Sequence, residues 1–327
     1  MINKFIFLPA CQHRDIISAL GYNVMEIPEK KYITLANGEI YAYLEQGDKK
    51  PEKPSFLLLH GNSSSSVHYL PLFKRLVDSH LLSPDLRGFG DSSYNSGFGS
   101  LSELAEDIKL FTETLNISKV HVAGWSAGGG VALELAARYP SLVASLFLIQ
   151  GMGYKGYPLY AKKPDGTFRP YSGREELARD PVLIAPALAA YESKDFAFFE
   201  RLWNLSIYIL NKPSEDENKL YISETLKQRN LVDFDWALAI FNMSDEHNGY
   251  VQGSGTIGNI RCPTVITSAK LDKLVPPGTA RENAAAIRNA KLLEYENCAH
   301  SPLVDCPDRL AADILAHTGI NTDTEVI

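Results

Sequence analysis

The patterned part of the chain begins with two short runs rich in β-branched and aromatic residues. Residues 31–36 ("KYITLA") and 39–45 ("EIYAYLE") are separated by Asn37 and Gly38, a pair typical of tight β-turns. Because such a turn reverses the chain, the pattern predicts an antiparallel hairpin at the start of the fold. The next run, "FLLLH" at 56–60, is apolar without alternation. It is typical of a strand buried on both faces.

Strand-like and helix-like patterns then alternate as far as residue 151. In the run at 100–115, apolar residues recur at intervals of three and four and therefore share one face of a helix. These residues are Leu101, Leu104, Ile108, Phe111 and Leu115. The expected strands are 80–85, 119–124 and 143–151, and the next expected helix is 129–140. Such alternation predicts a mostly parallel sheet with helices on both faces.

The alternation stops near residue 152 and resumes only after residue 256. Residues 153–256 show helical patterns, including a long run at 181–210, and no convincing buried strand. The segment holds 16 of the 33 aromatic residues of the chain. This enrichment predicts an inserted helical domain that covers an apolar pocket, or has an aromatic core of its own, or both. Strand patterns return at 263–269 and 290–296, and a helical pattern follows at 306–319.

These boundaries divide the 327 residues into three expected parts. Residues 31–152 and 257–327 form an α/β core, residues 153–256 form the helical insertion, and residues 1–30 form an N-terminal extension. The start, "MINKFIFLPAC", resembles a lipoprotein signal that ends before Cys11. However, its apolar run is about four residues long where roughly 7 to 15 are typical. We therefore interpret it as part of the mature chain.

Composition narrows the classes of function. The net charge is −7 and the basic residues form no run, which disfavours binding to nucleic acid or to an anionic membrane. No apolar stretch reaches 18 residues, so no membrane span is expected. The four cysteines, Cys11, Cys262, Cys298 and Cys306, form no C-x-x-C pattern. This indicates reduced thiols in a cytoplasmic protein rather than a metal or redox motif.

The clearest candidate for chemistry is the stretch from Gly124 to Gly128, "GWSAG". It matches G-x-S-x-G and lies between an expected strand and an expected helix, as that motif requires. A serine at a strained strand-to-helix turn brings the residues two before and two after it together, and only glycine fits there. The turn would present the Ser126 hydroxyl beside a helix N-terminus, whose N–H groups favour a developing oxyanion. The alternative, a glycine-rich turn that only packs well, is disfavoured by this context.

A serine nucleophile needs a base, and the base needs an acid that orients it. Both should follow later strands, because ligands bind at the carboxyl ends of strands in open α/β sheets. Asp272 follows the strand at 263–269 and His300 follows the strand at 290–296, so they are the predicted acid and base. Two alternatives stay open. His247 could contact substrate, although an exposed loop position is favoured, and Asp305 is a rival acid that should rather N-cap the last helix.

An oxyanion hole needs a second backbone N–H besides that of Ala127. His60 ends the expected strand at 56–60, and Gly61 begins the loop that follows it. In proteins with a G-x-S-x-G turn, the corresponding loop supplies this donor. We assign the donor to the N–H of Asn62, with Ser63 as the neighbouring alternative.

Taken in order, these motifs resemble the α/β-hydrolase fold superfamily. The resemblance covers roughly residues 31–151 and 257–318. It rests on His60-Gly61, on "DLRGFGDS" at 85–92, on the serine turn, and on Asp272 and His300. It implies an eight-stranded, mostly parallel sheet with helices on both faces, a Ser126-Asp272-His300 triad and a helical cap domain at 153–256. Neither a cofactor nor a metal is expected.

The resemblance implies several activities, since members of the superfamily act on different bonds. The expected one is hydrolysis of a carboxylic ester or lactone through an acyl-enzyme, with a small apolar or aromatic substrate. The alternatives are a C–C bond hydrolase, an acyltransferase or perhydrolase with the same triad, and a ligand-sensing receptor on the hydrolase fold. A dehalogenase or epoxide hydrolase is disfavoured, because those members carry aspartate at the position of Ser126.

Overall fold

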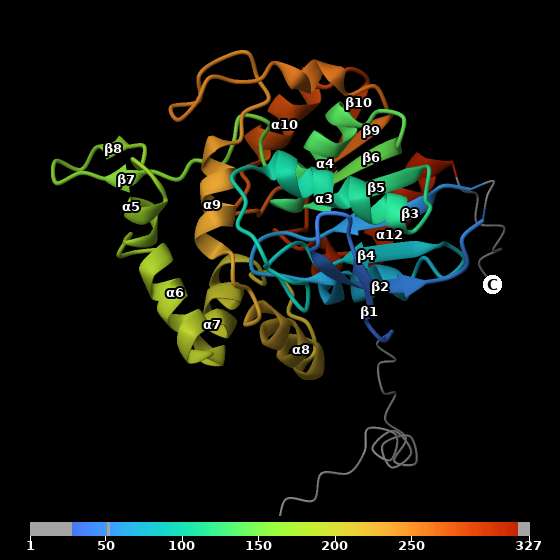
Figure 1. The fold of residues 1–327 in the computed structure, drawn as a ribbon, viewed down its shortest axis with the longest axis horizontal. Coiled ribbons are helices and arrows are strands. Elements are labelled where there is room, and N and C mark those ends of the chain that lie inside the picture. The colour runs from blue at the N-terminus through green and yellow to red at the C-terminus, as the bar shows by residue number, and fades with distance from the viewer. Residues whose placement is uncertain (1–27, 51–52, 320–327) are drawn as a thin grey trace, which may run out of the picture.

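A sheet of eight strands forms the centre of the computed structural model, which describes residues 28–50 and 53–319 (Figure 1). The strands are β1 (Lys31–Thr34), β2 (Ile40–Gln46), β3 (Ser55–Leu59), β4 (Leu81–Pro84), β5 (Val120–Trp125), β6 (Val143–Ile149), β9 (Thr264–Ala269) and β10 (Ala290–Tyr295). Their order in the sheet is β1-β2-β4-β3-β5-β6-β9-β10. The pairs β1–β2 and β2–β4 are antiparallel, and the other neighbours are parallel. The predicted α/β fold class is therefore confirmed.

Helices cover both faces of this sheet. One face carries α3 (Leu101–Thr114), α4 (Gly128–Arg138) and α10 (Pro277–Ala286). The other carries the 3₁₀-helix η1 (Ser66–Tyr69), α2 (Leu70–Phe73) and α12 (Pro307–Thr318), with α11 (Pro302–Asp305) before α12. Strand β3 shows why its sequence is apolar throughout. Leu57 and Leu59 pack with α3 and α4, while Phe56 and Leu58 pack with α2 and α12.

The predicted hairpin forms, but its loop is longer than the Asn-Gly pair. The pairing of β1 with β2 ends at Thr34 and Ile40, which leaves a loop of five residues. Within it, Gly38 adopts φ +87°, and the side chain of Asn37 accepts a hydrogen bond from the N–H of Glu39 at 3.1 Å. The Asn-Gly signal therefore located the turn correctly and misjudged its length.

The segment between β6 and β9 is mainly helical. Its helices are α5 (Arg174–Ala178), α6 (Ile184–Ser193), α7 (Phe196–Ser206), α8 (Glu215–Thr225) and α9 (Leu231–Ile240), followed by the 3₁₀-helix η2 (Thr256–Asn259). Two strands of two residues each, β7 (Ala161–Lys162) and β8 (Phe168–Arg169), form a separate antiparallel ribbon. Figure 1 shows α5, α6 and α7 to the left of the sheet, with α9 between α5 and the sheet.

The long helical run expected at 181–210 is divided into α6 and α7. Lys194 adopts φ +54°, a left-handed conformation that ends α6. Asp195 then caps α7, because its carboxylate accepts a hydrogen bond from the N–H of Phe198 at 3.0 Å. The apolar pattern predicted helix correctly, and the break follows from these two polar residues.

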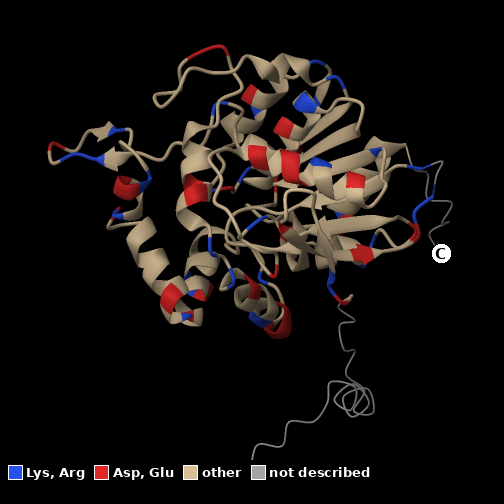
Figure 2. Ribbon diagram, in the orientation of Figure 1, with Lys and Arg blue, Asp and Glu red and all other residues tan. Residues whose placement is uncertain are grey.

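Positive and negative charges are mixed over the described residues (Figure 2). Figure 2 shows Lys and Arg interspersed with Asp and Glu over the described part of the chain. No helix among residues 28–50 and 53–319 is long and apolar enough to cross a membrane. The predicted N-terminal extension lies outside the described residues except for 28–30, and so does Cys11.

Candidate active site

Ser126 lies at the turn between β5 and α4, in a backbone conformation that few residues other than glycine adopt. Its φ is +53°, which costs about 1–3 kcal/mol for a residue with a side chain. Three backbone hydrogen bonds hold it there. Its N–H donates to the carbonyl of Ile149 at 3.0 Å, and its carbonyl accepts from the N–H groups of Gly129 at 2.9 Å and Met152 at 3.0 Å. The turn is thus fixed by β6 and by the first turn of α4.

The glycines around Ser126 let three backbone segments meet. A Cβ atom on Gly128 would lie 2.3 Å from the carbonyl oxygen of Leu59 and 2.4 Å from that of His60. A Cβ atom on Gly124 would lie 2.6 Å from the carbonyl oxygen of Gly128. Backbone oxygens cannot move aside without shifting a strand, so the turn accepts only glycine at these positions.

The structure brings the three predicted side chains into one hydrogen-bonded chain. Ser126 Oγ lies 2.9 Å from His300 Nε2, and His300 Nδ1 lies 2.8 Å from Asp272 Oδ2. The other oxygen of Asp272 accepts from the N–H groups of Leu274 at 2.8 Å and Val275 at 2.9 Å, which fixes the carboxylate. A carboxylate at Nδ1 favours the tautomer with its proton there, which leaves Nε2 as the acceptor for the Ser126 hydroxyl.

The loop that carries His300 is braced from two sides. The indole N–H of Trp125 donates to the carbonyl of His300 at 2.9 Å. The carboxylate of Asp305 accepts from the N–H of Ala299 at 2.8 Å. The expectation that Asp305 caps the last helix is wrong, since Asp305 ends α11 and Cys306 precedes α12. Its carboxylate is used by the loop instead, because that loop would otherwise leave a buried N–H unpaired.

The loop after β3 lies directly against the serine turn. A Cβ atom on Gly61 would lie 3.0 Å from Ser126 Cβ and 3.2 Å from the carbonyl oxygen of Trp125. Within the described part of the chain, the backbone N–H groups of Asn62 and Ala127 donate to no other residue. Both residues line the cavity that contains Ser126.

Side chains from the helical segment hold this loop. Gln228 donates to the side-chain oxygen of Asn62 at 2.9 Å and accepts from the N–H of Ser63 at 3.1 Å. The hydroxyl of Thr225 donates to the carbonyl of Ser63 at 2.6 Å. The side-chain N–H of Asn62 donates to Asp235 Oδ1 at 2.8 Å. Ser63 is kept at φ +53° by these contacts. Residues of α8, α9 and the link between them thus set the conformation of the loop beside Ser126.

Asp235 is the unusual member of this set. It belongs to α9, is only 6% exposed and lines the same cavity as Ser126. Burial raises its pKa to about 7, although the hydrogen bond from Asn62 acts in the opposite direction. Sequence reasoning did not single out Asp235, Gln228 or Thr225. The one local signal was the pair Asp233 and Asp235 within the otherwise apolar run "LVDFDWALAI" of α9.

An apolar cavity of about 300 Å³ opens above the Ser126 hydroxyl. Its polar side chains include Asn62, Ser126, Asp235 and His300. Most of the remaining lining is apolar and comes from the helical segment, including Leu159, Ile184, Ala187, Phe198, Phe199, Leu202, Trp203, Leu231 and Leu238. The cavity therefore suits a small, largely apolar molecule whose reacting carbon rests near Ser126.

Two other histidines, His247 and His60, lie outside the hydrogen-bonded chain formed by Ser126, His300 and Asp272. His247 is exposed, accepts from the N–H of Gly249 at 3.0 Å and does not line the cavity. His60 is fully buried, which lowers its pKa to about 4 and keeps it neutral. Its Nε2 accepts from the N–H of Leu86 at 2.9 Å, and its Nδ1 donates to the carbonyl of Gly61 at 2.8 Å. His60 thus joins the loops that follow β3 and β4.

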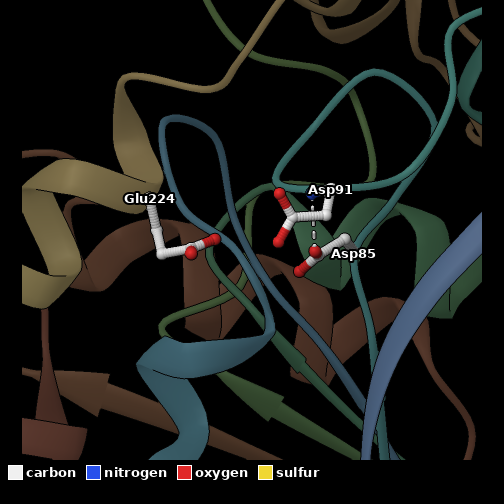
Figure 3. Close-up of side chains that lie close together, drawn as sticks. All are labelled: Asp85, Asp91 and Glu224. Carbon is white, nitrogen blue, oxygen red and sulfur yellow. Dashed lines mark hydrogen bonds between the residues drawn. The ribbon is translucent and has the colours of Figure 1, made fainter. Parts of the chain in front are cut away.

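Three carboxylates, those of Asp85, Asp91 and Glu224, face a common centre and lie within 4.8 Å of one another (Figure 3). The ammonium of Lys30 donates to all three at 2.8, 2.8 and 2.7 Å, and Lys227 also pairs with Asp91 and Glu224. Burial acts to lower the pKa of Lys30, but the charges of Asp85 and Glu224 outweigh it and raise that pKa above its usual value. The position that a metal would take is therefore filled by an ammonium group.

Known proteins resemble this chain in sequence. A family model described as the alpha/beta hydrolase fold matches residues 54–307. Lipase 1 of Psychrobacter immobilis is 26% identical over 89% of this chain and 84% of its own length. The 2-hydroxy-6-oxononadienedioate/2-hydroxy-6-oxononatrienedioate hydrolase of Cupriavidus pinatubonensis is 25% identical over 85% of this chain and 92% of its own.

A solved structure shows the same fold. The esterase from Exiguobacterium antarcticum superposes with a TM-score of 0.67 at 17% identity and covers 89% of this chain and 100% of its own. The family model spans most of the sequence, and the relatives are named as hydrolases. The chain therefore belongs to the family with the alpha/beta hydrolase fold, and it is a hydrolase.

Proposed function

We propose that this hydrolase cleaves a carboxylic ester or lactone through an acyl-enzyme. The observation that carries the proposal is the hydrogen-bonded chain from Ser126 through His300 to Asp272 at the base of an apolar cavity. Ser126 Oγ attacks the carbonyl carbon while His300 Nε2 takes its proton. Asp272 holds the imidazole and stabilises the positive charge that forms on it.

The backbone N–H groups of Asn62 and Ala127 bind the oxyanion of the tetrahedral intermediate. They are suited to this role because they donate to no other described residue and face the same cavity. His300 then gives its proton to the leaving alcohol, which leaves the acyl group esterified to Ser126. Water attacks this ester with His300 as base, and the acid is released. Loss of one oxyanion donor typically lowers kcat by about 100- to 1000-fold, so both donors matter.

We propose that residues 153–256 act as a cap domain on the core formed by 31–152 and 257–327. Helices α6, α7 and α9 supply much of the cavity lining, which supports a role in substrate selection. The cavity volume of about 300 Å³ supports a small apolar or aromatic ester or lactone. A cytoplasmic location is part of the proposal. It is supported by the four cysteines of the sequence, which form no C-x-x-C pattern and are few for a disulfide-stabilised protein of this length.

The test is a panel of short-chain esters, lactones and thioesters assayed with the wild type and with Ser126→Ala. We expect multiple turnovers of at least one ester or lactone without any partner protein, and loss of turnover in the variant. A stoichiometric burst of the leaving alcohol before steady turnover would identify the acyl-enzyme. Absence of turnover, with ligand binding that changes an interaction with another protein, would instead favour a receptor.

A C–C bond hydrolase is the second candidate, because one of the relatives described above is named as a 2-hydroxy-6-oxononadienedioate/2-hydroxy-6-oxononatrienedioate hydrolase. The same triad would serve, with a ketone carbonyl in place of the ester. A β-diketone such as benzoylacetone separates the two, since its cleavage removes the absorbance of the enol. Cleavage of this substrate at a rate above that of the best ester would replace the first proposal with the second.

A further inference from the structure

The carboxyl group of Asp235 has one oxygen to which no residue of the described part of the chain donates. Asp235 Oδ1 accepts from the side chain of Asn62 at 2.8 Å. Asp235 Oδ2 accepts a hydrogen bond from no described residue. It is nevertheless not one of the fully inaccessible polar atoms, so part of its surface is open. Asp235 is 6% exposed and lines the cavity above Ser126. The free oxygen therefore faces the space that the substrate would occupy.

The surroundings of Asp235 provide no counter-charge. Among residues 28–50 and 53–319, no lysine and no arginine lines the cavity. The charge of Asp235 raises the pKa values of Tyr157 and Tyr191, and no positively charged side chain of the described residues acts on the pKa of Asp235 itself. A carboxyl group placed in an apolar site costs free energy unless its oxygens are hydrogen-bonded. A group kept at such a cost inside a cleft, with a pKa raised to about 7, is typical of a functional site.

We propose that Asp235 determines substrate specificity by binding a hydroxyl group of the substrate through Oδ2. The preferred substrate is then an ester or lactone that carries one free hydroxyl on an otherwise apolar skeleton. This inference rests on the proposed ester hydrolysis and adds the substrate class to it.

A hydroxyl fits this position better than an ammonium group does. A hydroxyl donates to an ionised carboxylate and accepts from a protonated one, so it pairs with both forms of Asp235. An ammonium group pairs only with the ionised form and must leave water for a cavity whose other lining is mainly apolar.

The position of Asn62 indicates where on the substrate the hydroxyl lies. The side chain of Asn62 contacts Asp235, and its backbone N–H is one of the two proposed donors to the oxyanion. The bound hydroxyl therefore lies on the side of the scissile carbonyl oxygen, near the reacting bond rather than at the far end of the cavity. It belongs either to the acyl part or to the alcohol part of the ester.

The test compares isosteric esters that differ by one hydroxyl. On the alcohol side the pair is hydroxyethyl butanoate and propyl butanoate. On the acyl side it is methyl β-hydroxybutanoate and methyl isovalerate. We expect kcat/KM of the wild type to favour the hydroxy ester of at least one pair by about tenfold or more. In Asp235→Leu this ratio should fall to about one. In Asp233→Asn, a control on the same helix whose carboxylate contacts Tyr94, it should be unchanged.

The ratio of kcat/KM between the two esters of a pair distinguishes a direct contact of Asp235 with the substrate from an effect that Asp235 exerts through Asn62. Loss of the support that Asp235 gives to Asn62 would slow both esters of a pair equally and leave the ratio intact. An equal kcat/KM for both members of both pairs in the wild type would overturn the inference without any variant. So would a ratio unchanged in Asp235→Leu, or a preference for dimethylaminoethyl butanoate over hydroxyethyl butanoate.

Binding tests Asp235 without turnover. The same ester pairs are titrated into Ser126→Ala, alone and combined with Asp235→Leu or, if that protein does not fold, with Asp235→Ala. Tighter binding of a hydroxy ester that disappears in the double variant supports the inference. If the wild type hydrolyses plain alkyl esters but no hydroxy preference exists in rate or binding, only the role of Asp235 fails. If no ester turns over but the hydroxy preference in binding persists, only the proposed reaction fails.

Discussion

The strained backbone conformation of Ser126 requires glycine at Gly124 and Gly128. A single added Cβ atom at either position would therefore disturb the turn. Gly128 shows this most directly, because a Cβ atom there would lie 2.3 Å and 2.4 Å from the backbone oxygens of Leu59, the last residue of β3, and of His60. In Gly128→Ala we expect a loss of about 1–3 kcal/mol of unfolding free energy and a large loss of activity, since the turn and the loop must separate. Urea unfolding and ester turnover measure the two effects.

Gly278 provides the matched control for this substitution. It lies in the first turn of α10, and a Cβ atom there would meet no atom within 4 Å. Alanine at this position should leave activity unchanged and alter stability by less than about 1 kcal/mol, in the stabilising direction. Equal effects of the two substitutions would show that the close approach at Gly128 is unimportant.

The orientation of His300 depends on a charge that can be removed with little change of shape. Asp272→Asn replaces the acceptor at His300 Nδ1 by a group that can donate, which favours the tautomer with its proton on Nε2. The imidazole could then no longer take the proton of Ser126, and we expect kcat to fall by about 10,000-fold with little change in KM. Asp245→Asn, at an exposed loop position, is the control. A decrease of less than tenfold in Asp272→Asn would remove Asp272 from the proposed mechanism.

At the scale of elements, the helical segment supports the loop beside Ser126 as well as covering it. Gln228 lies between α8 and α9 and makes four side-chain hydrogen bonds, two of them to Asn62 and Ser63. Gln228→Ala should lower kcat by about tenfold with a smaller change in KM, because the N–H of Asn62 acts mainly on the transition state. Gln252→Ala, at an exposed site, serves as the control. A change confined to KM would mean that Gln228 only shapes the cavity.

The ammonium of Lys30, the residue before β1, donates to Glu224 of α8 and to Asp85 and Asp91 after β4. Lys30→Ala leaves Lys227, which pairs with Asp91 and Glu224, as the remaining lysine beside the three converging carboxylates. We therefore expect a loss of about 3 kcal/mol of unfolding free energy. The neighbouring Lys31 is the control, because its pair with Glu45 is largely exposed and should be worth about 1 kcal/mol or less. Urea unfolding of the two variants gives the comparison. Similar losses would show that the convergence of the carboxylates is not energetically important.

The elements of the core could be predicted because their patterns are local. A strand buried on both faces reads as an unbroken apolar run, and the turn at Ser126 needs glycines two residues before and after it. The support of Asn62 could not be predicted in this way, since Gln228 and Asp235 lie more than 160 residues away in the sequence. Asp305 was misassigned for a related reason. Its partner is a loop N–H whose position depends on tertiary packing rather than on the start of α12.

For the whole molecule, stability at acid pH depends on buried histidines. Burial lowers the pKa of His60 to about 4 and that of His68 to about 3, against an ordinary value of 6.5. Between pH 6.5 and the lowered pKa of each histidine, the unfolded chain binds a proton that the folded protein does not. The contribution of the neutral histidines to the unfolding free energy is therefore fully present above pH 6.5 and is lost as the pH falls. His60 alone should account for a loss of about 3 kcal/mol by pH 4. Urea unfolding across this range measures it, and a flat profile would contradict the neutral, buried state of both side chains.

Asp235 has the opposite effect on stability as the pH falls, because its pKa is raised in the folded protein, whereas the pKa values of His60 and His68 are lowered. With a folded pKa of about 7 and an ordinary value of 3.8, the folded protein holds a proton that the unfolded chain has released. The stability that this proton contributes is greatest below pH 4 and is lost as the pH rises to about 7. Asp235→Asn has no such proton, so its unfolding free energy relative to the wild type should rise by up to about 4 kcal/mol over that interval.

Paired urea titrations of the wild type and Asp235→Asn, at about pH 4 and about pH 8, isolate this contribution because the histidines are common to both proteins. A hydroxy ester bound through Asp235 Oδ2 would lower the desolvation cost of the ionised form. In the Ser126→Ala background, which does not consume the ester, the protein with Asp235 should therefore gain more stability from that ligand at the higher pH than at the lower one, and the protein with Asp235→Asn should gain equally at both. A difference between the two proteins that does not change with pH would show that the carboxyl of Asp235 is solvated, and it could not then be the buried polar group that selects the substrate.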